Sequence, residues 1–191
     1  MELAKIFLVA LLVNNVVLMR FLALCSYVGM TNDVGQSVGM GFAVTFVTVL
    51  ATAATWPIYH FLLVPLGLTF LKILVFILVI ASLVQLVEFY LKKNIPGLYA
   101  AMGIYLPLIT TNCAILAVTF ENIDYGYTFI ESIVYAIGVS LGYLLAMVLL
   151  AGVRDRMKTS PVPKFLQGTP ILFIASSLLG VAFMGFSGLI K

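Results

Sequence analysis

The sequence predicts an all-α integral membrane protein with six transmembrane helices, arranged as two inverted three-helix repeats. Of its 191 residues, 63% are hydrophobic and 9% are charged, and the mean hydropathy is +1.21. A soluble domain carries about 25% charged residues, which it needs to cover its surface. The composition therefore excludes a soluble enzyme, a nucleic-acid-binding module and a disordered chain. Long charge-free runs predict the six spans, and a weak similarity between the two halves of the sequence predicts the repeat.

The charge-free runs decide where the spans lie. A helix that crosses a ~30 Å hydrocarbon core needs about 20 mostly apolar residues. Runs without Asp, Glu, Lys or Arg occur at residues 34–71, 94–120, 132–153 and 165–190. The first run is too long for one span, and the helix within it is ended by Trp56, Pro57, Pro65 and Gly67. We expect spans near residues 3–25, 36–58, 70–91, 98–120, 128–152 and 170–190.

The first span, residues 3–25, is predicted to be interrupted because Asn14, Asn15 and Arg20 lie inside an apolar segment. A cleaved signal peptide is the alternative interpretation, and the sequence does not favour it. A signal peptide has a basic start and a small-residue cleavage site, whereas this stretch has no Ala-x-Ala motif. A lipoprotein signal ending at Cys25 would require a small residue before the cysteine, and a leucine precedes it.

The distribution of basic residues predicts the orientation. With six spans, both termini lie on one side of the membrane. The loops on the opposite side hold Lys92, Lys93, Arg154, Arg156, Lys158 and Lys164. The side of the termini holds both basic and acidic residues, namely Lys5, Lys72, Lys191, Glu2, Glu121, Asp124 and Glu131. Because cytoplasmic loops carry an excess of Lys and Arg, we expect both termini outside and the basic loops in the cytoplasm.

The chain is predicted to be one membrane domain with an internal repeat at an offset of about 98 residues. Residues 11–18 align with residues 108–116, so that Asn15 lies opposite Asn112. Each half has three predicted spans, an odd number, so the second copy enters the membrane upside down. In such inverted repeats, discontinuous helices meet near the midplane and form the functional site. The two halves are approximately residues 1–95 and 96–191.

Two clusters of polar residues lie at membrane depth in corresponding spans. Asn14 and Asn15 interrupt the first span, and Thr110, Thr111 and Asn112 interrupt the fourth. Unpaired polar groups in hydrocarbon cost several kcal/mol each. Such clusters are tolerated where they satisfy freed backbone groups or line a site, although single Asn and Thr residues also serve as hydrogen bonds between helices. Their matching places favour broken helices in the first and fourth spans.

Cys25 ends the first interrupted span, and Cys113 directly follows the polar break of the fourth. A free cysteine is often only an apolar filler. The alternative is metal ligation, because thiolates favour iron–sulfur clusters, zinc or copper(I). A [2Fe–2S] centre needs four protein ligands, and this chain has two cysteines. A second, similar chain would complete the set across a pseudo-symmetric interface.

Few charged groups lie within the spans. Arg20 is well inside the first span, where it either offsets the charge of a cluster or extends its side chain to the membrane interface. Glu88 lies near a helix end and is expected to form a surface ion pair with Lys92, and His60 is expected to be solvated. Close helix packing is the expected role of Gly39, Gly41, Gly138 and Gly142.

Several stretches of the chain resemble the A-subunit family of the Rnf complex, the ion-translocating ferredoxin:NAD oxidoreductase. They are LVNNVVLMRFLALC (12–25), LPLITTNCAIL (106–116), VGMG near residue 40, the loop 153–168 and the terminal AFMGFSGL. The related E subunit of the sodium-translocating NADH:quinone reductase is the nearest competitor. In the family the first motif usually reads Phe-Leu-Gly-Leu-Cys followed by proline, whereas this chain has Ala23 and Ser26 in those places.

The resemblance implies a six-span subunit of the bacterial cytoplasmic (inner) membrane that pairs with a homologous E subunit of opposite orientation. The pair would share one intramembrane [2Fe–2S] cluster, for which Cys25 and Cys113 of this chain are the implied ligands. We further expect Asn15, Thr111 and Asn112 to brace the loops around it. The complex, with its B, C, D and G subunits, would pass electrons from ferredoxin to NAD and translocate Na⁺ or H⁺. This subunit is not expected to catalyse a reaction alone.

Two other functions remain open from the residues. One is a self-contained secondary transporter with inverted repeats, in which the cysteines are incidental. The other is a purely structural scaffold. The transporter differs from the redox subunit in one respect: it would tolerate replacement of the two cysteines, whereas the redox subunit would lose its cluster.

Overall fold

The computed structural model describes residues 2–65, 67, 69–94, 106–159, 161, 163 and 166–188. Every regular element in this part of the chain is helical, which confirms the predicted all-α class. The α-helices are α1 (Glu2–Leu8), α2 (Val16–Arg20), α3 (Leu24–Met30), α4 (Val34–Ile58), α5 (Lys72–Asn94), α7 (Leu106–Thr110), α8 (Cys113–Asp124), α9 (Phe129–Lys158) and α10 (Thr169–Met184). Two π-helices, Val9–Val13 and Tyr59–Leu63, and two 3₁₀ turns, Thr69–Leu71 and Gly185–Gly188, extend them.

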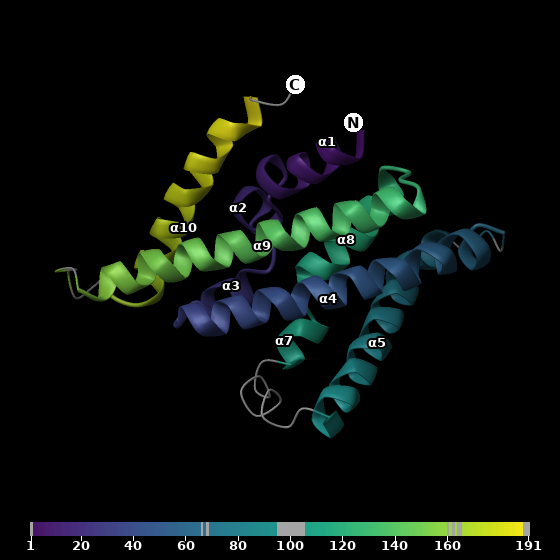
Figure 1. The fold of residues 1–191 in the computed structure, drawn as a ribbon, viewed down its shortest axis with the longest axis horizontal. Coiled ribbons are helices and arrows are strands. Elements are labelled where there is room, and N and C mark those ends of the chain that lie inside the picture. Colours follow the sequence, from purple (N-terminus) through teal and green to yellow (C-terminus); the bar gives the residue numbers. More distant parts are fainter. Residues whose placement is uncertain are drawn as a thin grey trace.

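The two longest helices, α4 and α9, form the centre of the molecule. They run side by side along its length, with α1 and α10 on one side of α9 and α5 beyond α4 (Figure 1). Their directions are opposite, because Trp56 near the end of α4 donates a hydrogen bond to the carbonyl of Tyr127, just before α9, at 3.0 Å. At the other end, Lys158 donates to the carbonyl of Asn32 at 3.4 Å. The core residues Met40, Tyr143 and Met147 are fully buried between these helices and their neighbours.

Local sequence signals explain where α9 begins. The hydroxyl and backbone N–H of Thr128 both donate to the carboxylate of Glu131 at 2.9 Å, and the two residues form a capping box. This arrangement satisfies backbone donors that every helix start leaves unpaired. The helix continues to Lys158, six residues beyond the predicted end at 152. The extension is stabilised by tertiary contacts, because Arg154 donates to the carbonyl of Val28 at 3.1 Å.

The structure also departs from the prediction after α4 and at the end of α10. The α-helix α4 ends at Ile58 as expected, but the chain continues as a π-helix to Leu63 despite Pro57 inside the helix. A proline lacks the N–H that would donate one intrahelical hydrogen bond. The backbone hydrogen bonds after it change from the i→i−4 pattern of an α-helix to the i→i−5 pattern of a π-helix. The α-helix α10 ends at Met184 rather than 190, after which the chain tightens into a 3₁₀ turn.

Among the described residues, three helices are long and apolar enough to cross a membrane, namely Val34–Leu63, Lys72–Tyr90 and Phe129–Lys158. Shorter apolar helices cover Leu3–Val13 and Thr169–Met184. The first part of the predicted span 98–120, up to residue 105, lies outside the described residues. The structure is thus that of a largely apolar helical protein, while six spans and an inverted repeat stay predictions.

The charged residues gather at the two ends of the α4–α9 pair. At one end, the Nζ of Lys72 lies 3.0 Å from Oδ1 of Asp124. At the opposite end lie Arg154 and Lys158, which contact the end of α3 and the segment between α3 and α4. This separation agrees with the grouping of charges from which the orientation was predicted. Between the ends, α5 and α10 expose many large apolar side chains, including Leu74, Leu78, Leu86, Phe89, Phe173, Leu178 and Val181.

Glycines allow the N-terminal segment to approach α9 closely. A Cβ on Gly142 would lie 2.8 Å from the carbonyl oxygen of Leu11, and one on Gly138 would lie 2.9 Å from the Cβ of Ala10. Between the two central helices, a Cβ on Gly41 of α4 would lie 2.7 Å from the side chain of Leu144 of α9. The predicted role of glycine in close helix packing is therefore confirmed at these three positions.

Replacing Gly142 by alanine is expected to destabilise the protein by about 1–3 kcal/mol, because the new methyl group forces the backbone at Leu11 to move. Thermal unfolding of the purified protein in detergent would measure the change, with an expected fall in Tm of several degrees, at roughly 2–4 °C per kcal/mol. Gly152→Ala in the same helix is the matched control, since nothing lies within 4 Å of its added Cβ. Equal Tm values for the two variants would contradict the packing argument.

Candidate functional site

The chain is broken at Asn14 and Asn15, as the polar cluster in this stretch predicts. The π-helix Val9–Val13 ends there, and Asn15 then caps α2 by accepting hydrogen bonds from the N–H groups of Val17 and Leu18, at 3.1 and 3.2 Å. Its amide nitrogen donates to the carbonyl of Gly142 in the middle of α9, at 2.8 Å. The side chain of Asn15, which is fully buried, therefore joins the start of α2 to α9.

A second break occurs at Thr111 and Asn112, again where the polar cluster predicts it. Asn112 caps α8 by accepting a hydrogen bond from the N–H of Ala114 at 3.0 Å, and it is buried. Asn15 and Asn112, which the repeat alignment places opposite each other, thus have the same local role. Each supplies the side-chain acceptor that the start of a helix requires. Thr111 is exposed in the turn that precedes Asn112.

A further turn separates α2 from α3 and was not predicted. Phe21 and Ala23 both have positive φ angles, 53° and 61°. Residues with a Cβ are strained in this left-handed region, whereas glycine adopts it freely. Glycine, which the resemblance implies at the position of Ala23, would adopt this angle without strain. The hydroxyl of Ser26 donates to the carbonyl of Ala23 at 3.0 Å and holds the turn from inside.

Both cysteines lie in the first turn of a helix that follows a break. Cys25 is the second residue of α3, and Cys113 is the first residue of α8. Both thiols are free and exposed, although residues next to them in the chain, such as Ser26 and Asn112, are buried. Exposure of this kind leaves the sulfur atoms accessible to a group bound outside the chain.

Tyr143 brings the two breaks together. Its buried hydroxyl donates to Ser26, the residue after Cys25, at 2.8 Å, and the side chain of Asn112 lies nearby. The neighbouring residue of α9, Gly142, accepts the hydrogen bond from the first break. Sequence reasoning missed Tyr143, because a tyrosine in a charge-free run gives no sign of its partners.

The donor set fits half of a four-cysteine cluster. Within the described ranges, no group of three or more His, Cys, Asp or Glu residues is placed to hold a metal ion. Two exposed thiols in one chain are too few for a [2Fe–2S] centre, which takes four protein ligands. They suit a centre whose other ligands come from a second chain. The assignment of Cys25 and Cys113 as ligands, and of Asn15, Thr111 and Asn112 as supporting residues, stays a prediction.

Arg20 has a partner that neither sequence interpretation included. Its guanidinium forms an ion pair with the buried carboxylate of Glu121 in the last turn of α8, and it donates to the hydroxyl of Tyr125 at 3.4 Å. The second carboxylate oxygen of Glu121 accepts a hydrogen bond from Tyr135 at 2.5 Å. The pair connects the two broken segments near the same end as Lys72. His60 is exposed at the surface of the chain and stacks on the ring of Trp56, with 4.3 Å between the ring centroids, while its predicted solvation stays a prediction.

Comparison with known proteins agrees with the resemblance noted in the sequence. The family model described as "Rnf-Nqr subunit, membrane protein" matches residues 3–190. The chain is 51% identical over 189 residues to the A subunit of the Na⁺-translocating ferredoxin:NAD⁺ oxidoreductase complex of Acetobacterium woodii, covering 99% of this chain and 98% of that protein.

Two further relatives have related names. The chain is 53% identical over 178 residues to the A subunit of an ion-translocating oxidoreductase complex from an Azoarcus species, covering 93% and 92% of the two chains. It is 48% identical over 186 residues to the A subunit of the proton-translocating ferredoxin:NAD⁺ oxidoreductase complex of Clostridium ljungdahlii, covering 97% and 96%. With a family model that spans nearly the whole chain and relatives of this similarity, the chain belongs to the Rnf-Nqr subunit family of membrane proteins.

Proposed function

We propose that the chain is the A subunit of an ion-translocating ferredoxin:NAD oxidoreductase complex and takes part in electron transfer through the membrane. Cys25 and Cys113 would supply two ligands of a [2Fe–2S] cluster, and a homologous E subunit of opposite orientation would supply the other two. The observation that carries the proposal is that Asn15 bonds to Gly142, while Ser26 and Asn112 lie beside the neighbouring Tyr143 and each is next in the chain to an exposed cysteine.

The position of Gly142 and Tyr143 along α9 supports a role of the chain in electron transfer across the membrane. This helix has 30 residues, and Gly142 and Tyr143 lie close to its midpoint. A redox centre at that depth would divide a ~30 Å hydrocarbon core into two steps of about 15 Å each. Such a centre, when bound, supplies one-electron oxidation and reduction. The chain itself would provide the thiolate ligands and a shell of fixed hydrogen bonds around them.

The residues around the breaks would hold the ligands in place. Asn112 caps the helix that Cys113 begins, so the position of that thiol depends on the cap. Ser26, next to Cys25, is held between the carbonyl of Ala23 and the hydroxyl of Tyr143. Because ligand orientation depends on hydrogen bonds from supporting residues, these contacts are where the protein would tune the centre.

The names of the relatives favour this function over a secondary transporter or a scaffold, since each of the three relatives compared above is named as a subunit of an oxidoreductase complex. One relative is named for Na⁺ and another for H⁺, so the proposal covers either ion. The complex would lie in the bacterial cytoplasmic membrane with B, C, D and G subunits. Both termini of this chain would lie outside.

Replacing both cysteines in the variant Cys25→Ser, Cys113→Ser is expected to remove one [2Fe–2S] signal from the purified complex, because serine does not supply the thiolates. Low-temperature EPR of the reduced complex under argon, together with iron quantitation, would measure the loss. Ser177→Ala is the control, because this exposed hydroxyl on α10 bonds only to the carbonyl of Phe173 within its own helix. An unchanged spectrum and iron content in an intact complex would refute the ligand assignment.

Replacing Asn112 by alanine is expected to shift the midpoint potential of that same signal, because the cap that fixes the start of α8 is lost. Asn112→Asp retains a capping oxygen and adds a negative charge, so it should lower the potential, by about 60 mV for each tenfold change in the relative stability of the reduced state. Redox titration monitored by EPR would measure both values.

Thr119→Ala is the matched control for this titration. It removes a buried hydroxyl from the same helix, where Thr119 donates to the carbonyl of Leu116, without changing the break. If Asn112→Ala gave the same potential as Thr119→Ala and the wild type, Asn112 would have no bracing role.

A further inference from the structure

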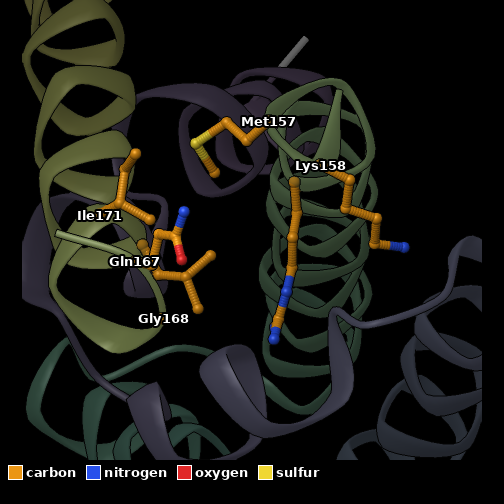
Figure 2. Close-up of a pocket in the computed structure, with 7 residues that line it drawn as sticks. Met157, Lys158, Gln167, Gly168 and Ile171 are labelled. Carbon is orange, nitrogen blue, oxygen red and sulfur yellow. The ribbon is translucent and has the colours of Figure 1, made fainter. Parts of the chain in front are cut away.

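A cavity of about 360 Å³ lies between the end of α9 and the start of α10, away from the cysteines. Its walls include Arg154, Met157 and Lys158 of α9, Gln167 and Gly168 just before α10, and Ile171 in the first turn of α10. We call it the headgroup pocket. Figure 2 shows Met157, Gln167 and Ile171 facing the space between the two helices, whereas the ammonium group of Lys158 points away from α10. Arg154 is therefore the cation best placed to serve this pocket.

A second feature, a shallow and open depression of about 530 Å³ on the surface of α9, extends towards the middle of the helix. It is lined by Val148, Leu149, Gly152, Val153, Arg156 and Met157, and we call it the α9 groove. Met157 lines both cavities, so the two adjoin each other. From the first to the last of its lining residues, the groove spans roughly 14 Å along the helix axis. Its surface is apolar except at the end that carries Arg156.

The groove is open because of Gly152. This residue is exposed, and no atom lies within 4 Å of the position that a Cβ would take. The glycine therefore does not serve close packing within the described part of the chain, in contrast to Gly142. A larger side chain here would fill the groove without disturbing the helix contacts.

The guanidinium of Arg154 is held firmly but keeps donors for a ligand. Its Nη1 donates to the carbonyl of Val28 at 3.1 Å and to the hydroxyl of Thr31 at 3.3 Å. Within the described residues, its Nη2 and Nε donate to no acceptor. Lys158 donates to the carbonyl of Asn32 and to Asp155, each at 3.4 Å. Neither cavity has an acidic residue in its wall, so the local charge favours an anion.

We infer that the headgroup pocket and the α9 groove together bind one anionic phospholipid. The phosphate would lie against Arg154, and an acyl chain would lie in the groove beside Gly152. A cationic pocket that adjoins an apolar groove matches the two chemical parts of such a lipid. Arginine suits this role because its fork of N–H donors binds phosphate oxygens in pairs. Basic pockets between helices at the cytoplasmic end of a membrane protein bind anionic headgroups in the same way.

The position in the molecule supports a lipid rather than a soluble anion. The pocket lies at the end of the α4–α9 pair where basic residues gather, while the groove extends from it into the apolar part of α9. A free phosphate ion would contact only the pocket, and the groove would contribute nothing to its binding. A lipid uses both cavities, so its binding must depend on the arginine and on the open space at Gly152.

The test measures lipid retained by the purified complex that contains this chain. The complex would be reconstituted with phosphatidylglycerol or phosphatidylcholine, washed with detergent, and examined by native mass spectrometry. The wild-type complex is expected to retain more phosphatidylglycerol than phosphatidylcholine. Arg154→Gln should weaken that retention about fivefold, the effect of one basic charge at the membrane surface. Gly152→Leu should reduce it by at least as much, because the leucine occupies the groove.

Two matched controls accompany these variants. Lys93→Gln removes an exposed cation from α5, and Gly185→Leu adds the same side chain at an exposed glycine with nothing within 4 Å, after α10. Both should retain lipid as the wild type does. If Arg154→Gln fails to fold because its contacts to Val28 and Thr31 are lost, Gly152→Leu still tests the site.

Three outcomes would overturn the inference. The first is equal retention of the two lipids by the wild type, since the site would then not select an anionic headgroup. The second is displacement of phosphatidylglycerol by millimolar inorganic phosphate with no effect of Gly152→Leu, which would make the pocket a site for a free anion. The third is loss of another protein from the Gly152→Leu complex without loss of lipid, which would make the groove a protein interface.

Discussion

The hydrogen bonds of Asn15 are the interaction on which the rest of this structure depends. The chain must break at this point in an apolar interior, and each backbone group left unpaired there costs several kcal/mol. One buried side chain caps the helix after the break and donates to the carbonyl of Gly142 at 2.8 Å. That contact is only reachable because Gly142 has no Cβ, since a methyl group would lie 2.8 Å from the carbonyl oxygen of Leu11. The helix break, the cap that Asn15 provides and the absence of a side chain at Gly142 therefore depend on one another.

The second break follows the same logic and meets the first at α9. Asn112 caps α8, and its side chain lies near Tyr143, whose hydroxyl also holds Ser26 beside the first cysteine. An ion pair between Arg20 and Glu121 joins the two broken segments a second time, near the end of the helix pair. Arg20 is partly exposed, at 41% of its side-chain surface, so this pair contributes less than a fully buried one would. Its main effect is to fix α2 against α8.

The surface of the chain is suited to an assembly inside a membrane. Both cysteines are exposed, and the apolar faces of α5 and α10 have no covering elements of their own in the described part of the chain. At one end, a cationic pocket continues into an apolar groove along α9. A single chain therefore presents two exposed thiols, large lipid-compatible faces and a cationic pocket beside an apolar surface. These properties agree with membership of a family of membrane subunits.

The sequence by itself determined the features that depend on neighbouring residues. Hydropathy determined the helical class, the polar clusters determined where the first and fourth helical segments break, and the absence of side chains at Gly41, Gly138 and Gly142 determined where helices approach closely. Only the tertiary structure decided which distant residues meet. The partners of Arg20 and Tyr143 lie about a hundred residues away in the chain, at Glu121 and Ser26. No local pattern encodes such contacts, because they arise when separate helices pack and bring their buried polar groups within hydrogen-bonding distance.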